Sequence, residues 1–218
     1  MICSFLNKTD ADTLLIFFNG WGMDTARLQT WHADHCDVLA IHDYTVLSGL
    51  PERISRYATI HVVAWSLGVW AAHQALSLTH HVDPRVFKTV LAVNGTLSPI
   101  AADTGIPSDV FRGTADHWLD PGAREKFYMR TAGDATALSR RSCEDQQQEL
   151  HALEQQILHA GPVDSCCFTR AIIGTRDRIF PPAAQRAAWR RWPQVDVVER
   201  PLRHDPFCSV QSWSEVLQ

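Results

Sequence analysis

The feature of this sequence that most clearly indicates a chemical reaction is a serine with a small residue two positions away on each side. The segment Ala64-Trp65-Ser66-Leu67-Gly68 follows the mostly apolar run 60–63 and precedes the helix-forming stretch 69–72. This order predicts a strand, a sharp turn and a helix, the setting in which a small-x-Ser-x-Gly motif exposes a nucleophilic hydroxyl. The sequence therefore predicts Ser66 as a nucleophile. The alternative interpretation is a serine that caps an ordinary helix.

A serine nucleophile needs a general base, and the base needs an acid to orient it. Two loops near the C-terminus offer these groups: Asp177 follows the short apolar run 171–174, and His204 follows the alternating run 195–199. The resulting chain order of Ser, Asp and His is the order found in α/β-hydrolases. We therefore expect His204 to act as the base.

The choice of acid is less constrained than the choice of base. Asp177 is the preferred candidate because it comes just after the end of a predicted strand. Asp43, which follows the predicted strand 36–41, is the main alternative, and Asp205 is a more remote one.

Acyl transfer also needs donors for the negatively charged oxygen of the tetrahedral intermediate. The apolar run 13–18 leads into Asn19-Gly20-Trp21-Gly22-Met23-Asp24, where a glycine on each side of Trp21 allows a tight turn. We expect the backbone N–H groups of Trp21 and Leu67 to form this oxyanion hole. The alternative is a simple turn between a strand and a helix.

Composition narrows the class of protein. The chain has 218 residues, of which 45% are hydrophobic and 20% charged, and this composition suits one globular α/β domain. A net charge of −4 argues against nucleic-acid binding. The N-terminus lacks the pattern of a signal peptide, and no run of about 20 apolar residues suggests a membrane span. We expect a cytoplasmic protein.

The cysteines and histidines give no sign of a metal or a disulfide framework. Six cysteines occur without a C-x-x-C pair, and His32, His35 and Cys36 have no second ligand pair. Reduced thiols are expected in the cytoplasm. We predict no metal site and no cofactor.

The spacing of apolar runs indicates how these groups are positioned. Strands alternating with helices favour a mostly parallel sheet with helices on both faces, and ligands then gather at the carboxyl ends of the strands. Trp21, Ser66, Asn94 and Asp177 all fall at such ends, and Asn94 is a candidate substrate-binding residue. The predicted elements are strands at 2–6, 13–18, 36–41, 60–65, 86–93, 170–174 and 195–199 and a helix at 67–79.

This alternation stops after Gly95 and resumes at residue 170. The segment 96–141 is rich in turn-forming residues, including Asp120-Pro121-Gly122, and Ser142 then begins a capping box before a helix that reaches about His159. We predict that 96–165 is a helical lid inserted into a core made of 1–95 and 166–218. A lid of this kind excludes water and shapes the pocket.

A mild basic excess marks this insertion in a chain that is acidic overall. Arg112, Arg140 and Arg141 are candidate contacts for an acidic partner or a carboxylate, although a solvated face of mixed charge is an equally good interpretation. The basic residues of 111–141 are Arg112, Arg124, Lys126, Arg130, Arg140 and Arg141.

Taken together, these motifs resemble one known family. The similarity extends from about residue 13 to the C-terminus and is to the BioG family of bacterial pimeloyl-acyl-carrier-protein methyl ester esterases. The matching stretches are Phe17-Phe18-Asn19-Gly20-Trp21-Gly22-Met23-Asp24, Ala64-Trp65-Ser66-Leu67-Gly68, Ala92-Val93-Asn94-Gly95-Thr96-Leu97-Ser98-Pro99-Ile100, Gly105-Ile106-Pro107 and Arg203-His204-Asp205-Pro206-Phe207.

The resemblance implies a serine carboxylesterase with the α/β-hydrolase fold and a role in biotin biosynthesis. Such an enzyme would hydrolyse the methyl ester of pimeloyl-acyl carrier protein, with Ser66 as nucleophile and His204 as base. Its partner would be an acyl carrier protein, whose acidic surface could bind the basic residues of the insertion. A general small-ester carboxylesterase, a thioesterase and a non-catalytic binding module of hydrolase ancestry remain alternatives.

Overall fold

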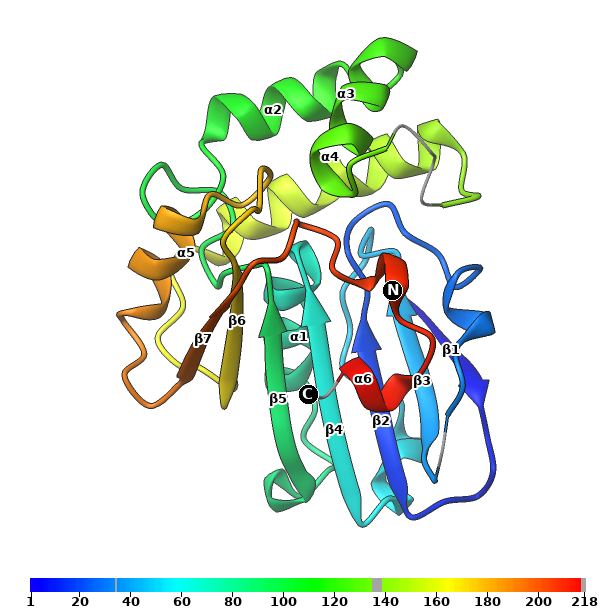
Figure 1. The fold of residues 1–218 in the computed structure, drawn as a ribbon. Coiled ribbons are helices and arrows are strands. Elements are labelled where there is room, and N and C mark those ends of the chain that lie inside the picture. The colour runs from blue at the N-terminus through cyan, green and yellow to red at the C-terminus, as the bar shows by residue number, and fades with distance from the viewer. Residues whose placement is uncertain (34, 135–138, 217–218) are drawn as a thin grey trace.

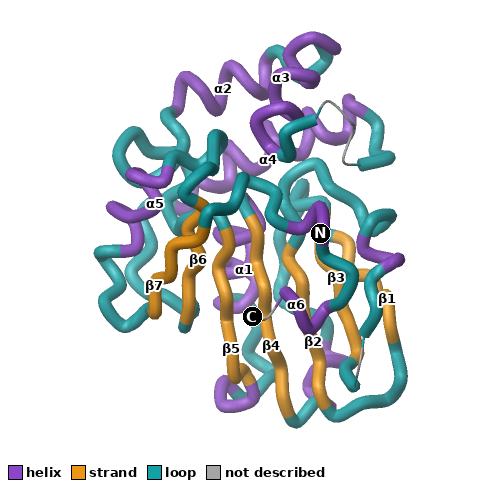
Figure 2. The backbone as a smooth tube through the Cα atoms, in the orientation of Figure 1, coloured by secondary structure: helices purple, strands orange, loops and turns teal. Residues whose placement is uncertain are grey.

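The computed structural model describes residues 1–33, 35–134 and 139–216. Residues 135–138 of the predicted lid and 217–218 of the predicted core lie outside the described residues. Seven strands form one sheet in the order β1-β3-β2-β4-β5-β6-β7 (Figures 1 and 2). The strands are β1 (Ile2–Asn7), β2 (Thr13–Phe18), β3 (Asp37–His42), β4 (Thr59–Trp65), β5 (Phe87–Val93), β6 (Arg170–Gly174) and β7 (Asp196–Arg200).

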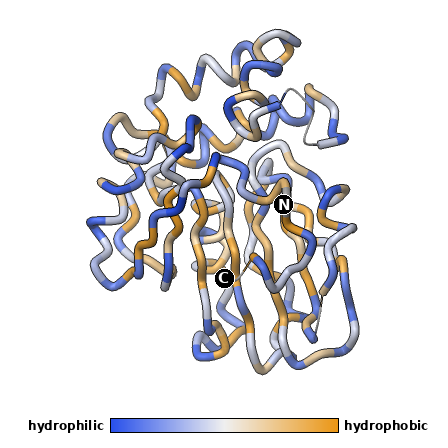
Figure 3. The backbone as a smooth tube through the Cα atoms, in the orientation of Figure 1, coloured by the Kyte–Doolittle hydropathy of each residue, from blue (hydrophilic) through white to orange (hydrophobic). Residues whose placement is uncertain are grey.

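The sheet is parallel except at one edge. β1 runs antiparallel to β3, and every other neighbouring pair is parallel. Each predicted strand lies within one residue of an observed strand at both ends. The central strands β2 and β3 are almost wholly buried, which explains their continuous apolar runs (Figure 3). The predicted mostly parallel sheet is confirmed.

The two faces of the sheet are covered differently. On one face, α1 (Leu67–Ser77) packs onto β2 and β4, and α5 (Pro182–Trp189) packs onto β6. On the other, Phe17 and Trp65 pack against Phe207 and Trp213, which belong to the C-terminal segment with the short helix α6 (Trp213–Val216). This second face is thus covered by short helical segments and the aromatic side chains that they carry, since Phe207 begins a 3-10 helix and Trp213 begins α6.

Residues 96–165 leave the sheet and carry the helices α2 (Ser108–Asp116), α3 (Pro121–Thr131) and α4 (Cys143–Ala160), which lie beyond the carboxyl ends of the strands (Figure 1). Ser142 caps α4, as the predicted capping box requires, since its side chain accepts a hydrogen bond from the Asp145 amide at 3.1 Å. The turn signal at 120–122 is instead the start of α3: Asp120 caps the helix and Pro121 occupies its first turn.

None of the helices among the described residues is long and apolar enough to cross a membrane. Within the same residues, no group of three or more His, Cys, Asp or Glu side chains is arranged to hold a metal ion.

Candidate active site

Ser66 occupies the tight turn between β4 and α1. Its backbone has φ 59° and ψ −131°, a conformation that is strained for a residue with a side chain. The Ser66 amide donates to the Val93 carbonyl at 3.0 Å, which holds the turn against β5. Gly68 allows α1 to approach β2, because a Cβ at this position would lie 2.3 Å from the Asn19 carbonyl oxygen. A glycine two positions after the serine is therefore a steric requirement of this turn.

His204 lies beside the serine and is 2% exposed. Its Nε2 is 2.9 Å from the Ser66 Oγ, and its Nδ1 is 2.9 Å from the Asp177 Oδ2. The Phe180 ring stacks on the imidazole at a centroid distance of 6.0 Å. The imidazole thus bridges a hydroxyl and a carboxylate, the arrangement that a general base for a serine nucleophile requires.

Asp177 is held by donors that leave its second oxygen facing the histidine. The Asp177 Oδ1 accepts hydrogen bonds from the Ile179 and Phe180 amides at 2.8 and 2.9 Å. The Gln185 side chain donates to Oδ2 at 3.1 Å. The Asp177 Oδ2 is thus directed at the imidazole, where it can orient the ring and stabilise its protonated form.

The two alternative acids lie in other surroundings. Asp43 pairs with Arg141 at 3.2 Å and accepts a hydrogen bond from the Thr45 hydroxyl at 2.7 Å. Burial would raise the pKa of Asp43, but the Thr45 hydrogen bonds and Arg141 outweigh it and hold the pKa below its ordinary value. Asp205 directs its carboxylate to Arg27 at 2.5 Å. The structure brings Asp177 to the imidazole and pairs Asp43 and Asp205 with arginines.

Trp21 and Leu67 lie at the same cavity as Ser66. Leu67 is the first residue of α1, and N–H groups in a first helical turn have no acceptor within the helix. Trp21 lies between Gly20 and Gly22, and Gly22 has φ +72°. The loop after β2 and the start of α1 thus bring both predicted donors to the site.

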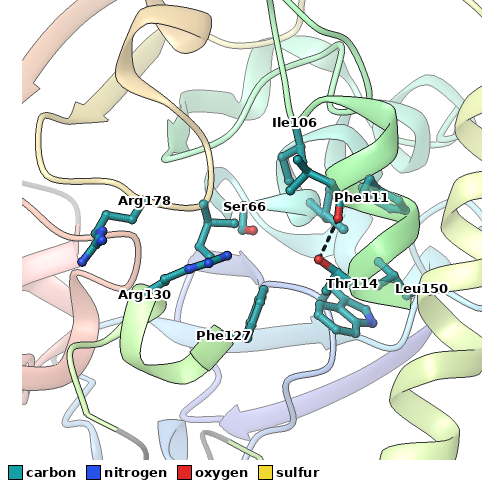
Figure 4. Close-up of a pocket in the computed structure, with 12 residues that line it drawn as sticks. Ser66, Ile106, Phe111, Thr114, Phe127, Arg130, Leu150 and Arg178 are labelled. Atoms are coloured by element: carbon teal, nitrogen blue, oxygen red, sulfur yellow. Dashed lines mark hydrogen bonds between the residues drawn. The ribbon is translucent and has the colours of Figure 1, made fainter. Parts of the chain in front are cut away.

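The cavity is a mostly apolar cleft of about 510 Å³, including its solvent-open part, between Ser66 and the helices of 96–165. In Figure 4, Ser66 lies at the centre, with Arg130 and Arg178 on one side and apolar residues of the helices on the other. The lining residues are Trp21, Ser66, Leu67, Ile106, Val110, Phe111, Thr114, Phe127, Arg130, Leu150, Arg178 and Ile179. The cleft suits an acyl chain with a polar or anionic group at its mouth.

Asn94 has a different place from the one expected. It is fully buried, and its amide nitrogen donates to the Arg203 and His204 carbonyls at 2.7 and 2.9 Å. Its amide oxygen accepts from the Gly174 amide at 2.7 Å. Asn94 therefore ties the ends of β5 and β6 to the loop that carries His204, and it does not line the cleft.

The three arginines predicted to bind substrate are also located elsewhere. Arg141 is 12% exposed, and its guanidinium pairs with Glu149 at 2.5 Å, so it is engaged by an internal partner. Arg112 forms a pair with Glu154 at 3.2 Å, and the Arg140 amide donates to Asp24 at 2.7 Å. None of the three lines the cleft among the described residues.

The two arginines that line the cleft, Arg130 and Arg178, were not singled out from the sequence as site residues. Arg178 is next to Asp177 and was hidden by that stronger signal. Arg130 was one of six basic residues in 111–141, and its spacing of three from Phe127 on α3 places both on one helical face toward the cleft. If α3 had been predicted as a helix, the shared face of Phe127 and Arg130 would have distinguished Arg130 from the other basic residues of 111–141.

The fold and the chain have clear relatives. The crystal structure of BioG from Haemophilus influenzae superposes with a TM-score of 0.86 at 30% identity and covers 100% of both chains. An esterase from Exiguobacterium antarcticum shares the fold, with a TM-score of 0.64 at 10% identity over 94% of this chain and 89% of the other. The predicted α/β-hydrolase fold is confirmed.

A longer relative gives a second comparison. A malonyl-[acyl-carrier protein] O-methyltransferase from Bacteroides fragilis is 36% identical over 186 residues, which are 82% of this chain. This chain matches only 36% of the length of that protein. The family model described as pimeloyl-ACP methyl esterase BioG matches residues 1–216. The chain thus belongs to the BioG family.

Proposed function

We propose that this protein hydrolyses the methyl ester of pimeloyl-acyl carrier protein in biotin biosynthesis, as a serine carboxylesterase. The observation that carries the proposal is the continuous hydrogen-bonded series from Ser66 through His204 to Asp177 at an apolar cleft. Membership of the BioG family supports the substrate class. The expected partner is an acyl carrier protein, and the expected location is the cytoplasm.

In this mechanism, His204 Nε2 takes the Ser66 hydroxyl proton as the oxygen attacks the ester carbonyl. The protonated imidazole is stabilised by Asp177. The tetrahedral oxyanion accepts hydrogen bonds from the Trp21 and Leu67 amides. His204 then returns the proton to the leaving methoxide, and methanol departs. A water molecule, deprotonated by the same histidine, cleaves the acyl-enzyme and releases the free carboxylate.

The methyl ester is supported by the relative from Bacteroides fragilis. That protein is named as an O-methyltransferase for malonyl-acyl carrier protein, so its reaction makes a methyl ester on a carrier-bound acid. A domain similar to this chain within such a protein fits an esterase that removes the same group. Residues 96–165 form the lid in this proposal, because they supply most of the apolar lining of the cleft: Ile106, Val110, Phe111, Phe127 and Leu150.

The test is methanol release from pimeloyl-acyl-carrier-protein methyl ester by the purified protein. We expect rapid release of one methanol per ester, and slower turnover of the same ester without its carrier. Two control assays measure cleavage of a p-nitrophenyl ester and cleavage of the thioester that joins the acyl group to the carrier. Cleavage of the small ester without methanol release would keep a hydrolase and reject the biotin role. Release of free acid from the thioester linkage would indicate a thioesterase.

The structure suggests where the carrier protein docks. A groove beside the cleft is lined by Lys126, Arg130, Arg178 and Arg203, all exposed, with Glu125 as its acidic member. Arg130 and Arg178 also line the cleft, so the groove leads to Ser66. A basic groove at this position suits an acidic partner whose prosthetic arm enters the cleft. Docking is therefore proposed here, in place of Arg140 and Arg141.

Charge reversal in the groove should weaken carrier binding alone. We expect Lys126→Glu with Arg203→Glu to raise KM for the carrier-bound ester about tenfold or more, with KM for a small methyl ester within about twofold of wild type. Arg140→Glu should leave both constants near wild type. A larger effect of Arg140→Glu than of the groove variants would return the docking surface to the position predicted from the sequence.

A further inference from the structure

The loop that carries Trp21 is hydrogen-bonded to α4 at Trp21 and at the following residue, Gly22. The Trp21 indole N–H donates to the Gln146 main-chain carbonyl at 2.7 Å, and the Gln146 side chain donates to the Gly22 carbonyl at 2.8 Å. The Gly22 amide donates to the Glu149 Oε2 at 3.1 Å. Three hydrogen bonds between one loop and one helix thus hold the Trp21 side chain and the backbone of the next residue.

The two side chains from α4 are built into this contact. Gln146 is 2% exposed and Glu149 is fully buried. The Gln146 amide oxygen accepts from the Trp118 indole at 3.0 Å, which fixes its orientation. Every polar group of the Gln146 side chain therefore has a partner, so the amide that reaches Gly22 cannot rotate without losing hydrogen bonds.

Glu149 is a buried carboxylate with a matched set of donors. Besides Gly22, it accepts from the Tyr44 amide at 2.9 Å and pairs with Arg141 at 2.5 Å. Burial raises the pKa of Glu149, and Arg141 and the amide donors act against this rise. A buried ion pair contributes little net stability compared with apolar packing. What it provides here is a fixed acceptor for the Gly22 amide.

These contacts matter because the loop has a glycine on each side of Trp21. Gly20 and Gly22 flank Trp21, and glycine permits many backbone conformations in the absence of other constraints. An oxyanion donor is effective only when its N–H already points to the developing charge. The β2 strand ends at Phe18, so the sheet alone does not fix the direction of the Trp21 amide.

We propose that Gln146 and Glu149 are positioning residues that fix the Trp21 N–H for the oxyanion. The inference rests on the proposed function, because it takes Trp21 as an oxyanion donor. It assigns to α4 a role beyond covering the cleft: the helix completes the oxyanion hole of the core. Displacement of α4 would release the loop, so oxyanion stabilisation depends on a closed position of this helix.

The test compares two glutamines on the same helix. Gln146→Glu removes the donor to Gly22, and Gln156→Glu removes an equivalent donor to the Tyr44 carbonyl at 3.0 Å, away from Trp21. We expect Gln146→Glu to lower kcat about 10- to 100-fold with KM within about twofold. Gln156→Glu should keep wild-type kcat. Gln146→Met, which adds no charge, should also lower kcat at least about tenfold.

A second readout separates positioning from a merely structural role. A trifluoromethyl ketone that forms a hemiketal with Ser66 carries the oxyanion, so its affinity should fall by the same factor as kcat. Thermal unfolding shows whether the variants fold. Equal kcat losses at Gln146 and Gln156, unchanged ketone affinity, or an effect of Gln146→Glu without one of Gln146→Met would each overturn the inference. Absence of esterase activity in the wild type would instead reject the proposed function.

Discussion

Ser66→Ala should lower kcat for ester hydrolysis by about 10⁵- to 10⁶-fold, and His204→Ala should have an effect of similar size. The reason is that the hydroxyl and the imidazole act as one unit: without the base the serine is a weak nucleophile, and without the serine the base has no partner. The measurement is methanol release under saturating ester, with thermal unfolding as the check on folding. Residual turnover within about 100-fold of wild type would reject the nucleophile.

The double variant makes this prediction stricter. Because Ser66 and His204 share one proton transfer at 2.9 Å, Ser66→Ala with His204→Ala should be no slower than either single variant. Multiplicative losses would mean that the two residues act in separate steps. Small residual hydrolysis above the uncatalysed rate is expected from the oxyanion donors and the cleft, which the substitutions leave in place.

Asp177→Asn should lower kcat by about 10⁴-fold. The Ile179 and Phe180 amides donate to Oδ1, so the carbonyl oxygen of the introduced asparagine should take that position. Its NH₂ group would then face His204 Nδ1, which must become an acceptor. The imidazole would carry its proton on Nε2, toward Ser66, and this tautomer cannot accept the serine proton.

Asp43→Asn is the matched comparison for this prediction. Asp43 pairs with Arg141 and bonds Thr45, so its loss should leave kcat within about threefold of wild type while the stability falls modestly. Methanol release by the two variants under identical conditions decides the assignment of the acid. A larger loss of kcat in Asp43→Asn than in Asp177→Asn would show that the acid comes from the end of β3.

The strands could be predicted because their environment leaves a direct mark on the sequence. β2 and β3 are almost entirely buried, and such strands need continuous apolar runs. The helices α2 and α3 carry a weaker signal, since most of their residues are exposed and their boundaries use Pro107, Asp120 and Pro121. The same residue types also mark turns, so the local sequence did not distinguish the two.

The positions of the proposed reacting groups could be predicted because motif geometry is local. Ser66 and Gly68 are separated by one residue, and the steric limits of the tight turn act within this short segment. The order of Ser66, Asp177 and His204 follows from the order of the strands that precede them. For these residues, chain position and chemistry were sufficient.

The surroundings of these groups were decided by the tertiary structure. Arg141 and Asn94 are polar residues in segments that the sequence placed near a pocket, yet both bind internal partners. Arg141, which is 12% exposed, pairs with Asp43 and Glu149, and the buried Asn94 bonds Arg203 and Gly174. Whether a charged side chain binds a ligand or an internal partner depends on which groups the fold brings within hydrogen-bond distance. The sequence by itself determined the sheet and the candidate reacting residues, because strand burial and the tight turn constrain neighbouring positions. The lining of the cleft, the basic groove and the support of the Trp21 loop by α4 were set only by long-range packing.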